Sequence, residues 1–466
     1  MKLRFLNLLW HRIRSSFWFV PALMTFGAIF LSIITLGIDR FWFAPDGNQR
    51  WWLFNGGPDG ARLLLSTIAG SMITVAGVVF SITIVVLSLA SSQFGPRLIR
   101  NFMETRINQT GLGTFIGTFV FCIMILQNIG ESGDDSFVPL ISVYSGTLLS
   151  LASLGVLIYF IHSVSTSIRA NSIIARVCKE LDHAIDKIFP EKNQTKEPRD
   201  ALGEKRGYVA EKYYRDIVPV MSRKRGYIQA IDIDEIVDIA VGEDVIIRID
   251  HRPGDFIVTD NPLLWMWPGK RSGKQLEKKL EKVFVVGSER TSEQDIEYPV
   301  HLLVEIAVRA LSPGVNDPYT AMACIDWLGE ALSKLARRKM HGPFRFDQEG
   351  NLRVISKPIT FSGAVDAAFN QIRQNSAANP AVSIRLLEAV AAVSYQADEN
   401  EKSKPLRQHA EMIYRSCRDN VEGEKDMADI QARYERVLEI LNKPRLPDGE
   451  SILGNWIENR FMKAEK

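Results

Sequence analysis

The chain has 466 residues, of which 46% are hydrophobic and 24% charged, so it is long enough for several domains and too charged to lie wholly inside a membrane. The formal net charge of +2 argues against a dedicated nucleic-acid binder, because such proteins usually carry a strongly basic domain. The mean hydropathy near zero averages two unlike parts. An apolar region covers residues 1–165, and a charged, globular region covers the rest.

Four uncharged stretches in the apolar region are long enough to be transmembrane helices. They are Phe17–Ile38 with 22 residues, Leu63–Ser92 with 30, Gly111–Ile129 with 19 and Phe137–Ile161 with 25. A helix rises about 1.5 Å per residue and a hydrocarbon core is about 30 Å thick, so each stretch can cross it. The first stretch is too long for the core of a signal peptide, and no small-residue cleavage pattern follows it.

Basic residues are unevenly distributed among the segments that flank the spans. They cluster before the first span, between the second and third spans and after the fourth, whereas the other two loops are neutral or acidic. The clustered residues are Lys2, Arg4, Arg12, Arg14, Arg97, Arg100, Arg106, Arg169, Arg176 and Lys179. By the positive-inside rule, both termini are cytoplasmic.

Small and hydroxyl-bearing residues form a stripe along one face of the second span, at steps of three, four or seven residues and interrupted near Ile84. The stripe consists of Ser66, Gly70, Thr74, Gly77, Ser81, Ser88 and Ser92. One interpretation is close helix packing, because small residues let helix backbones approach in lipid. The other is a pore wall, because hydroxyls and backbone carbonyls lower the desolvation cost for a crossing solute.

Other features of the spans narrow the class of membrane protein. The second span would be about 45 Å long, so it should tilt or project beyond the bilayer, and Gly95 with Pro96 predicts its end. Gly113 and Gly117 form a G-x-x-x-G pair, which predicts a helix contact. No Asp, Glu, Lys or Arg lies inside a span, which argues against a proton-coupled pump or a voltage sensor.

The region after the spans begins with a helical extension and polar linker at residues 166–206, followed by a small β-rich module at residues 207–290. The β-prone runs are Gly226–Ile231, Val245–Ile249, Phe256–Val258 and Val283–Val286, with a helix expected at Asp234–Val241. Together they predict a small sheet or a partly open barrel.

Residues 291–466 predict a helical module. The expected helices are Asp295–Leu311, Tyr319–Arg337, Ser362–Gln374, Ala381–Gln396, Pro405–Asn420 and Glu424–Asn442. The predicted fold class is therefore membrane α-helical, with four transmembrane helices followed by a cytoplasmic α+β region that ends in a helical bundle.

Aromatic and basic residues gather after the third β-prone run. Trp265, Met266 and Trp267 lead into Pro268–Lys282, where six Lys and Arg outnumber two Glu. The glycine spacing is wrong for a Walker loop, and Gln275 stands where Ser or Thr would bind Mg²⁺. The segment is either a solvated helix face or a contact with an anionic membrane leaflet. The residues expected at such a contact are Trp265, Trp267, Lys270, Arg271 and Lys274.

Glu297, His301 and Glu305 stand one helical turn apart and could hold a metal. Such a row is more often an exposed series of ion pairs, and Arg309 at the next position would repel a cation. We therefore expect no metal site here.

The segment between the first two cytoplasmic bundle helices predicts a tight corner. Gly314 can adopt positive φ, Asn316 or Asp317 can cap the following helix, and Pro318 suits its first position. The alternative is that the corner binds an anion or a neighbouring subunit. The residues concerned are Arg309, Ser312, Pro313, Gly314, Asn316, Asp317 and Pro318.

Signatures of catalysis and of bound cofactors are missing. The cysteines Cys122, Cys178, Cys324 and Cys417 have no metal or dithiol spacing, so we expect reduced, buried thiols. The sequence has no nucleophile elbow, Ser-His-Asp spacing or dinucleotide loop. We expect neither an enzyme nor a cofactor.

Two motifs carry a family resemblance. The first is SSQFGPR at residues 91–97, and the second is DIEY at residues 295–298 followed by IAVRALSPGVNDPYTA at residues 306–321. With these motifs the chain resembles a bacterial family of predicted membrane proteins of unknown function, which have N-terminal spans and a large soluble C-terminal region. The resemblance implies an integral inner-membrane protein and no particular reaction.

Two hypotheses for function follow. The first is a homo-oligomeric channel whose second span faces the axis and whose cytoplasmic region gates, senses or filters, with membrane lipid and further copies of the chain as partners and no nucleic acid. The second is a membrane-anchored signalling or scaffold protein whose soluble region binds a partner or a small anion. A hydrolase at the bilayer surface is a third, weaker possibility, because no catalytic constellation is visible.

Overall fold

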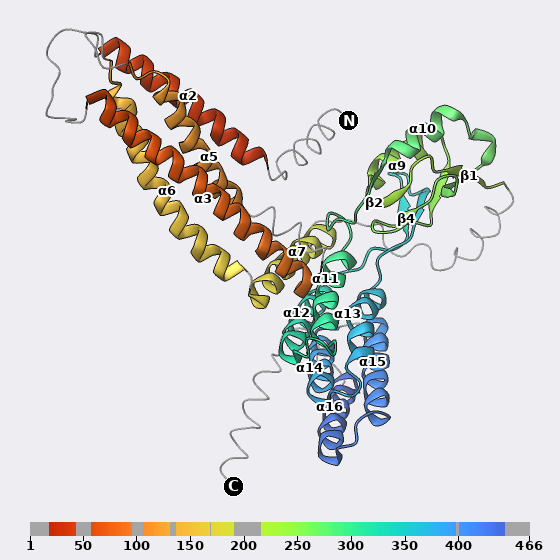
Figure 1. Cartoon of the computed structure of the whole chain (residues 1–466). Helices are drawn as coiled ribbons and strands as arrows, with labels where there is room; N and C mark the ends of the chain where they lie inside the picture. Colours follow the sequence, from red (N-terminus) through yellow and green to blue (C-terminus); the bar gives the residue numbers. More distant parts are fainter. Residues whose placement is uncertain are drawn as a thin grey trace, which may run out of the picture. The chain divides into compact units, whose positions relative to one another are not determined.

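The computed structural model describes residues 18–42, 57–95, 106–130, 137–167, 169–190, 216–397 and 400–442. They form two compact units, which divide between Ile173 and Ile174 (Figure 1). The basic residues before the first span, Arg97, Arg100 and the linker residues 191–206 lie outside the described residues. The orientation in the membrane therefore stays a prediction.

The first unit contains four helices that are long and apolar enough to cross a membrane, which confirms the four expected spans. They are α2 (Phe19–Trp42), α3 (Gly57–Phe94), α5 (Arg106–Leu126) and α6 (Leu140–Ser167). At 38 residues, α3 begins earlier than expected and is about 57 Å long. Its early start places Asp59 in the first turn, where a negative charge is favourable. Gly95, with φ of 105°, follows its end as expected.

Helix α5 is the centre of the first unit, because it packs against α2, α3 and α6. A side chain at Gly113 would place its Cβ 2.7 Å from Met24 Sδ and 3.1 Å from Pro21 Cα. A Cβ at Gly117 would lie 3.5 Å from both Ala28 Cβ and the Met24 carbonyl oxygen. The G-x-x-x-G pair is thus a close contact between α5 and α2, as predicted.

A buried carboxylate joins α2 to α6. Asp39, near the end of α2, is fully buried. Its carboxylate accepts hydrogen bonds from the backbone N–H groups of Ile141 and Ser142 at 2.9 Å each, and from Ser142 Oγ at 2.6 Å. These N–H groups belong to the first turn of α6, where backbone N–H groups have no acceptors within the helix. Asp39 therefore caps α6 from another span.

The second unit contains eight strands in two sheets. The strands are β1 (Val218–Met221), β2 (Gly226–Ile231), β3 (Ile246–Ile249), β4 (Phe256–Ile257), β5 (Pro262–Trp267), β6 (Phe284–Gly287), β7 (Phe344–Phe346) and β8 (Leu352–Ser356). The five-stranded sheet has the order β1-β5-β3-β8-β7, and the three-stranded sheet has the order β4-β2-β6. Among the described strands, β3 and β8 are the one parallel pair, with Ile247 opposite Val354.

The four β-prone runs are confirmed as β2, β3, β4 and β6, whereas the other four strands were not expected. Trp265, Met266 and Trp267 are part of β5 and do not merely lead into a helix. Strands β7 and β8 follow the first two bundle helices in the sequence and return to the five-stranded sheet. The sheet is therefore larger than the sequence predicts.

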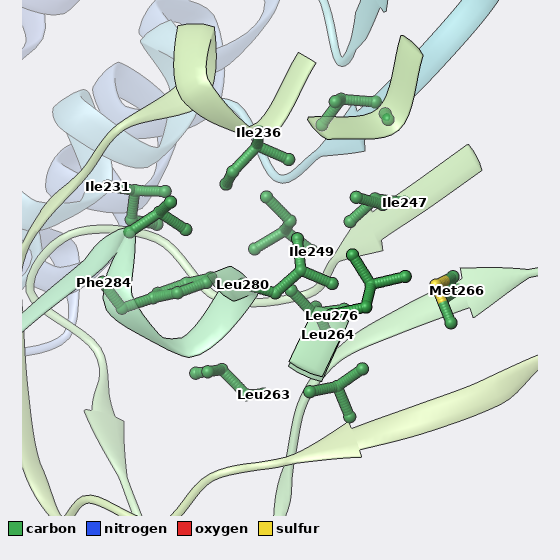
Figure 2. Packing of buried hydrophobic residues seen from close by; sticks show 14 of the residues in the cluster. Ile231, Ile236, Ile247, Ile249, Leu263, Leu264, Met266, Leu276, Leu280 and Phe284 are labelled. Atoms are coloured by element: carbon green, nitrogen blue, oxygen red, sulfur yellow. The ribbon is translucent and has the colours of Figure 1, made fainter. Parts of the chain in front are cut away.

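An apolar core lies between the sheets and two helices, α9 (Ile233–Gly242) and α10 (Lys274–Lys282). Ile236 of α9 and Leu276 and Leu280 of α10 are buried in it. Figure 2 shows Ile247, Met266 and Phe284 among the side chains that converge there. A short 3₁₀ turn, Gly269–Arg271, joins β5 to α10.

The rest of the second unit is a helical bundle, as expected. It consists of α11 (Glu297–Ala310), α12 (Pro318–Ala336), α13 (Phe361–Asn375), α14 (Pro380–Gln396), α15 (Asn400–Arg418) and α16 (Glu424–Asn442). Each helix matches an expected one to within two residues at its ends, except that α15 begins before Pro405. A Cβ at Gly329 of α12 would lie 3.2 Å from Ala389 Cβ of α14, so these helices pack closely.

Helix α7 (Ala170–Ile188) follows the fourth span almost directly and is anchored to the bundle. Lys334 Nζ and Arg338 Nη2 of α12 lie 2.8 Å and 2.7 Å from the carboxylate of Asp186. His341 Nε2 donates to the Ile188 carbonyl oxygen at 2.8 Å. Ion pairs and a hydrogen bond therefore hold the extension of the fourth span on the second unit.

Replacement of Gly113 by Leu should destabilise the first unit, because the new side chain would overlap Met24 and the backbone of Pro21. Overpacking of this kind costs about 1–3 kcal/mol. Gly155→Leu in α6 is the matched control, because a Cβ there meets nothing within 4 Å. Thermal unfolding in detergent should show a lower midpoint for Gly113→Leu only, and equal midpoints would contradict the close contact.

Candidate functional site

The stripe on α3 faces away from the other spans. Each of its seven residues is exposed in the described chain, and a Cβ at Gly70 or Gly77 would meet nothing within 4 Å. The packed face of α3 carries Leu65, Ala76, Val79, Thr83 and Val86, which are buried. At about 100° per residue, the two faces lie roughly 160° apart around the helix. Among the residues that the structure describes, nothing packs on the stripe at Gly70 or Gly77, and its other members are exposed.

Several hydroxyls of the stripe are bonded to their own helix. Ser66 Oγ donates to the Leu63 carbonyl oxygen at 3.0 Å, and Thr74 Oγ1 donates to the Gly70 carbonyl oxygen at 2.8 Å. Ser92 Oγ donates to the Leu89 carbonyl oxygen at 2.9 Å. The stripe thus presents oxygen atoms and bare backbone on a narrow, shallow surface, which suits either a second helix or a solute.

The corner between α11 and α12 is built by local capping. Asp317 caps α12, because its carboxylate accepts from the Thr320 N–H at 3.1 Å, and Pro318 occupies the first turn. Asn316 adopts the positive φ of 47° that the sequence assigned to Gly314, so that expectation was wrong. An Asn side chain tolerates the left-handed region because it can bond locally.

The tip of this corner is exposed and partly apolar. Val315 and Tyr319 are 52% and 78% exposed, and Pro313 and Gly314 are exposed beside them. Arg309 pairs with Glu305 of its own helix at 3.8 Å, and Ser312 Oγ donates to the Arg309 carbonyl oxygen at 2.6 Å. Arg309, Ser312, Asp317 and Pro318 thus have structural roles, which leaves the exposed tip as the part available to a partner.

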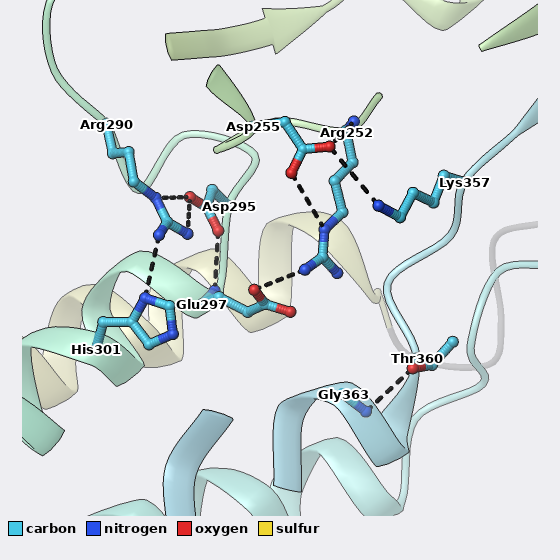
Figure 3. Close-up of polar contacts among 9 residues, drawn as sticks. All are labelled: Arg252, Asp255, Arg290, Asp295, Glu297, His301, Lys357, Thr360 and Gly363. Carbon is cyan, nitrogen blue, oxygen red and sulfur yellow. Dashed lines mark hydrogen bonds and ion pairs between the residues drawn. The ribbon is translucent and has the colours of Figure 1, made fainter. Parts of the chain in front are cut away.

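A cluster of charged residues joins the sheets to the start of α11 (Figure 3). Arg252 Nη2 lies 2.7 Å from Glu297 Oε2, and Arg290 Nη2 lies 2.7 Å from Asp295 Oδ2. Asp255 pairs with Arg252 and Lys357 at 3.9 Å each. Three basic side chains are thus balanced by three carboxylates, and the cluster is a joint between strands and bundle with no charge left for a ligand.

The cluster requires a glycine and a buried acid. Gly254 has a φ of 94°, and a Cβ there would lie 2.3 Å from Asp295 Oδ2. Burial raises the pKa of the Asp295 carboxyl, and the guanidinium of Arg290 opposes this shift.

Arg290 Nη1 lies 3.1 Å from His301 Nδ1. Because a guanidinium can only donate, His301 accepts at Nδ1 and carries its proton on Nε2.

The row of Glu297, His301 and Glu305 is divided among other partners. Glu297 bonds Arg252, His301 bonds Arg290 and Glu305 pairs with Arg309. In the part of the chain that the structure describes, no three His, Cys, Asp or Glu side chains are grouped so as to hold a metal. The four cysteines are free and buried, as expected.

The residues expected at a membrane surface are separated by the fold. Trp265 and Trp267 lie half-buried on β5, and the Arg248 guanidinium lies 5.4 Å from the Trp265 ring centroid. Arg271 bonds the Glu243 carbonyl oxygen and lies 3.3 Å from Asp244 Oδ2. Lys270 and Lys274 remain exposed. Only the lysines therefore present an unobstructed charge.

Sequence reasoning missed the charged joint. Nothing in the local sequence around Arg252 or Arg290 marks either residue as part of a charged cluster. One signal in the sequence could have indicated the joint. Asp295 and Glu297 stand at the start of an apolar helix, and acids that become buried there need basic partners. Arg290 lies only five residues before Asp295, whereas Arg252 lies 45 residues before Glu297, so this second partner is set by a long-range contact.

The structure thus defines an integral membrane protein with four spans and a large soluble α+β region. A family described as "Predicted membrane protein (DUF2254)" matches residues 14–392, and the chain belongs to this family. Uncharacterized proteins of Mycobacterium bovis and Mycobacterium tuberculosis are each 29% identical over 398 residues, which cover 84% of this chain and 75% of each relative. No solved structure matches the chain.

Glu297→Gln should loosen the joint, because it removes the charge that faces the largely buried Arg252. A lost charged hydrogen bond of this kind costs about 1–3 kcal/mol. Glu305→Gln is the control on the same helix, since its 3.8 Å pair with Arg309 is more exposed and should contribute well below 1 kcal/mol. Hydrogen exchange of peptides around residues 252–257 and 295–303 should rise only in Glu297→Gln, and equal protection in both variants would contradict the joint.

Proposed function

We propose that this protein is a homo-oligomeric channel of the bacterial inner membrane, with the α3 stripe facing the axis of the oligomer and both termini in the cytoplasm. The main observation that supports this proposal is that every residue of the stripe from Ser66 to Ser92 is exposed, although the opposite face of α3 is packed. The cytoplasmic region would gate or sense.

The first unit contains an internal comparison that supports this proposal. Gly113 and Gly117 are covered by α2 of the same chain, whereas no described residue lies within 4 Å of a Cβ at Gly70 or Gly77. A surface of Gly and hydroxyl residues gives lipid chains little to pack against, and small residues in membranes generally serve close contacts. The α3 stripe therefore fits a second copy of α3, or water between several copies.

The length of α3 also supports an axial position. About 57 Å of helix is nearly twice the thickness of a hydrocarbon core. The excess must tilt or project, and a projecting helix around an axis extends the pore wall beyond the bilayer.

The second candidate is a membrane-anchored signalling or scaffold protein. The observation that favours it is the exposed corner tip with Val315 and Tyr319, which would bind a partner protein or, at the start of α12, a small anion. In this case the α3 stripe would serve only to pack copies together.

Gly77→Leu should reduce single-channel conductance severalfold without preventing assembly, because the new side chain enters the axial surface. Purified protein in planar bilayers under salt and voltage steps gives the measurement, and size-exclusion chromatography with light scattering gives the oligomer mass. Gly155→Leu, also at an exposed glycine in a span, is the control and should leave the current unchanged. Currents unaltered by Gly77→Leu would contradict the axial position, and an oligomer without currents would favour the scaffold.

A further inference from the structure

We propose that one edge of the sheet module docks on the anionic surface of the membrane in which the same chain is embedded. The surface combines basic residues, Arg223, Arg225, Lys278 and Lys282, with two exposed apolar residues, Phe256 and Val258. We call it the basic-apolar surface. The membrane contact expected from the sequence consists of Trp265, Trp267, Lys270, Arg271 and Lys274, and the basic-apolar surface shares with it only the lysine-rich segment that ends at Lys282.

The first step of the argument is the charge of α10. Leu276 and Leu280 bury one face of this helix, so Lys274, Lys278 and Lys282 form an exposed row at i+4 spacing on the other. None of these three lysines forms an ion pair with a described residue, whereas Lys279 lies 3.8 Å from Glu243. Glu277 and Glu281 of the same helix offset part of the repulsion within this row, and the exposed lysine side chains present positive charge to an external anionic partner.

The second step is that the loop between β1 and β2 adds to the same charge. The Arg223 N–H donates to Glu281 Oε1 at 3.0 Å, and Lys224 Nζ donates to the Phe284 carbonyl oxygen at 3.2 Å. These bonds hold the loop against the end of α10, beside Lys282. The side chains of Arg223 and Arg225 remain exposed there.

The third step is the apolar component. Gly226 pairs with Ile257, which places Arg225 beside Val258 on the neighbouring strand. Phe256 and Val258 flank the buried Ile257 and are 55% and 50% exposed. Apolar side chains that project beside a basic cluster are typical of surfaces that insert into the headgroup region of an anionic bilayer.

Lipid is the favoured occupant because of tethering. The four spans keep the second unit permanently close to a membrane, so even a weak surface is repeatedly presented to headgroups at high effective concentration. The complementary charge is that of anionic lipid, and each basic residue near such a surface strengthens binding about fivefold. The inference does not depend on the channel hypothesis.

The test places a spin label at Thr259→Cys in the full-length protein. Thr259 is exposed in the turn after Val258. The four native cysteines are buried, and burial raises the pKa of Cys178 to about 12, so the label should attach selectively. Collisions with a nickel-chelating lipid headgroup are measured by electron paramagnetic resonance in nanodiscs of phosphatidylcholine, with and without phosphatidylglycerol.

Collisions should be frequent only in discs with phosphatidylglycerol, and should fall in about 0.5 M salt, where charges are screened beyond about 4 Å. Lys278→Glu/Lys282→Glu should reduce the docked population at least about tenfold, and Phe256→Ser/Val258→Ser should reduce it in both salt conditions. Lys404→Glu/Lys425→Glu is the control of equal charge change, because both lysines are exposed in the helical bundle. Rare collisions in every disc, or equal collisions in neutral discs, would overturn the proposal.

Discussion

The structure depends first on how helices are held together in a solvent that is as apolar as their side chains. Burial of Leu or Ile against another span gains little in lipid, so contacts must come from close approach and polar bonds. The first unit uses both: Gly113 lets α5 approach α2, Thr118 Oγ1 lies 3.0 Å from Ser153 Oγ between α5 and α6, and Asp39 caps α6. The α3 stripe has the same chemistry and lacks a partner among the described residues of the chain. The same physical constraint that explains the packing of one chain therefore argues for more than one chain.

In the second unit the organising interaction is electrostatic. The turn around Gly254 and the start of α11 are separate in the sequence, yet their charges form one balanced cluster of three basic and three acidic groups. Partly buried charges are costly unless they are paired, so the cluster tolerates few alternative arrangements. Its close fit around Gly254, where no Cβ can be accommodated, adds a steric requirement to the electrostatic one.

The sequence predicts the helices far better than the strands, for a physical reason. Spans and bundle helices are defined by local periodicity and by caps such as Asp317 or Gly95, so their limits can be read within a window of a few turns. Strand β8 exists because it pairs with β3, more than 100 residues earlier in the chain, and its own sequence is short. Strand β5 is hard to recognise in the sequence, because its residues Trp265–Trp267 run directly into a lysine-rich helical segment.

The candidate sites also differ in whether they depend on local sequence or on long-range contacts. Periodicity alone identified every residue of the α3 stripe, because one face of a helix is a local property. It could not show that this face lacks a partner, because that depends on where α5 and α6 pack. The sequence places Lys278 and Lys282 in a segment that is a candidate for contact with an anionic leaflet, but it cannot add Arg223 to them, because that juxtaposition depends on the bonds of Glu281 and Lys224.

Helix α7 gives the two parts of the protein a mechanical connection. It begins within three residues of the end of α6 and is fixed to α12 through Asp186. Helix α6 in turn contacts α3 and α5. If the second unit docks on anionic lipid, the free energy of docking acts on the end of a span that touches the stripe-bearing helix.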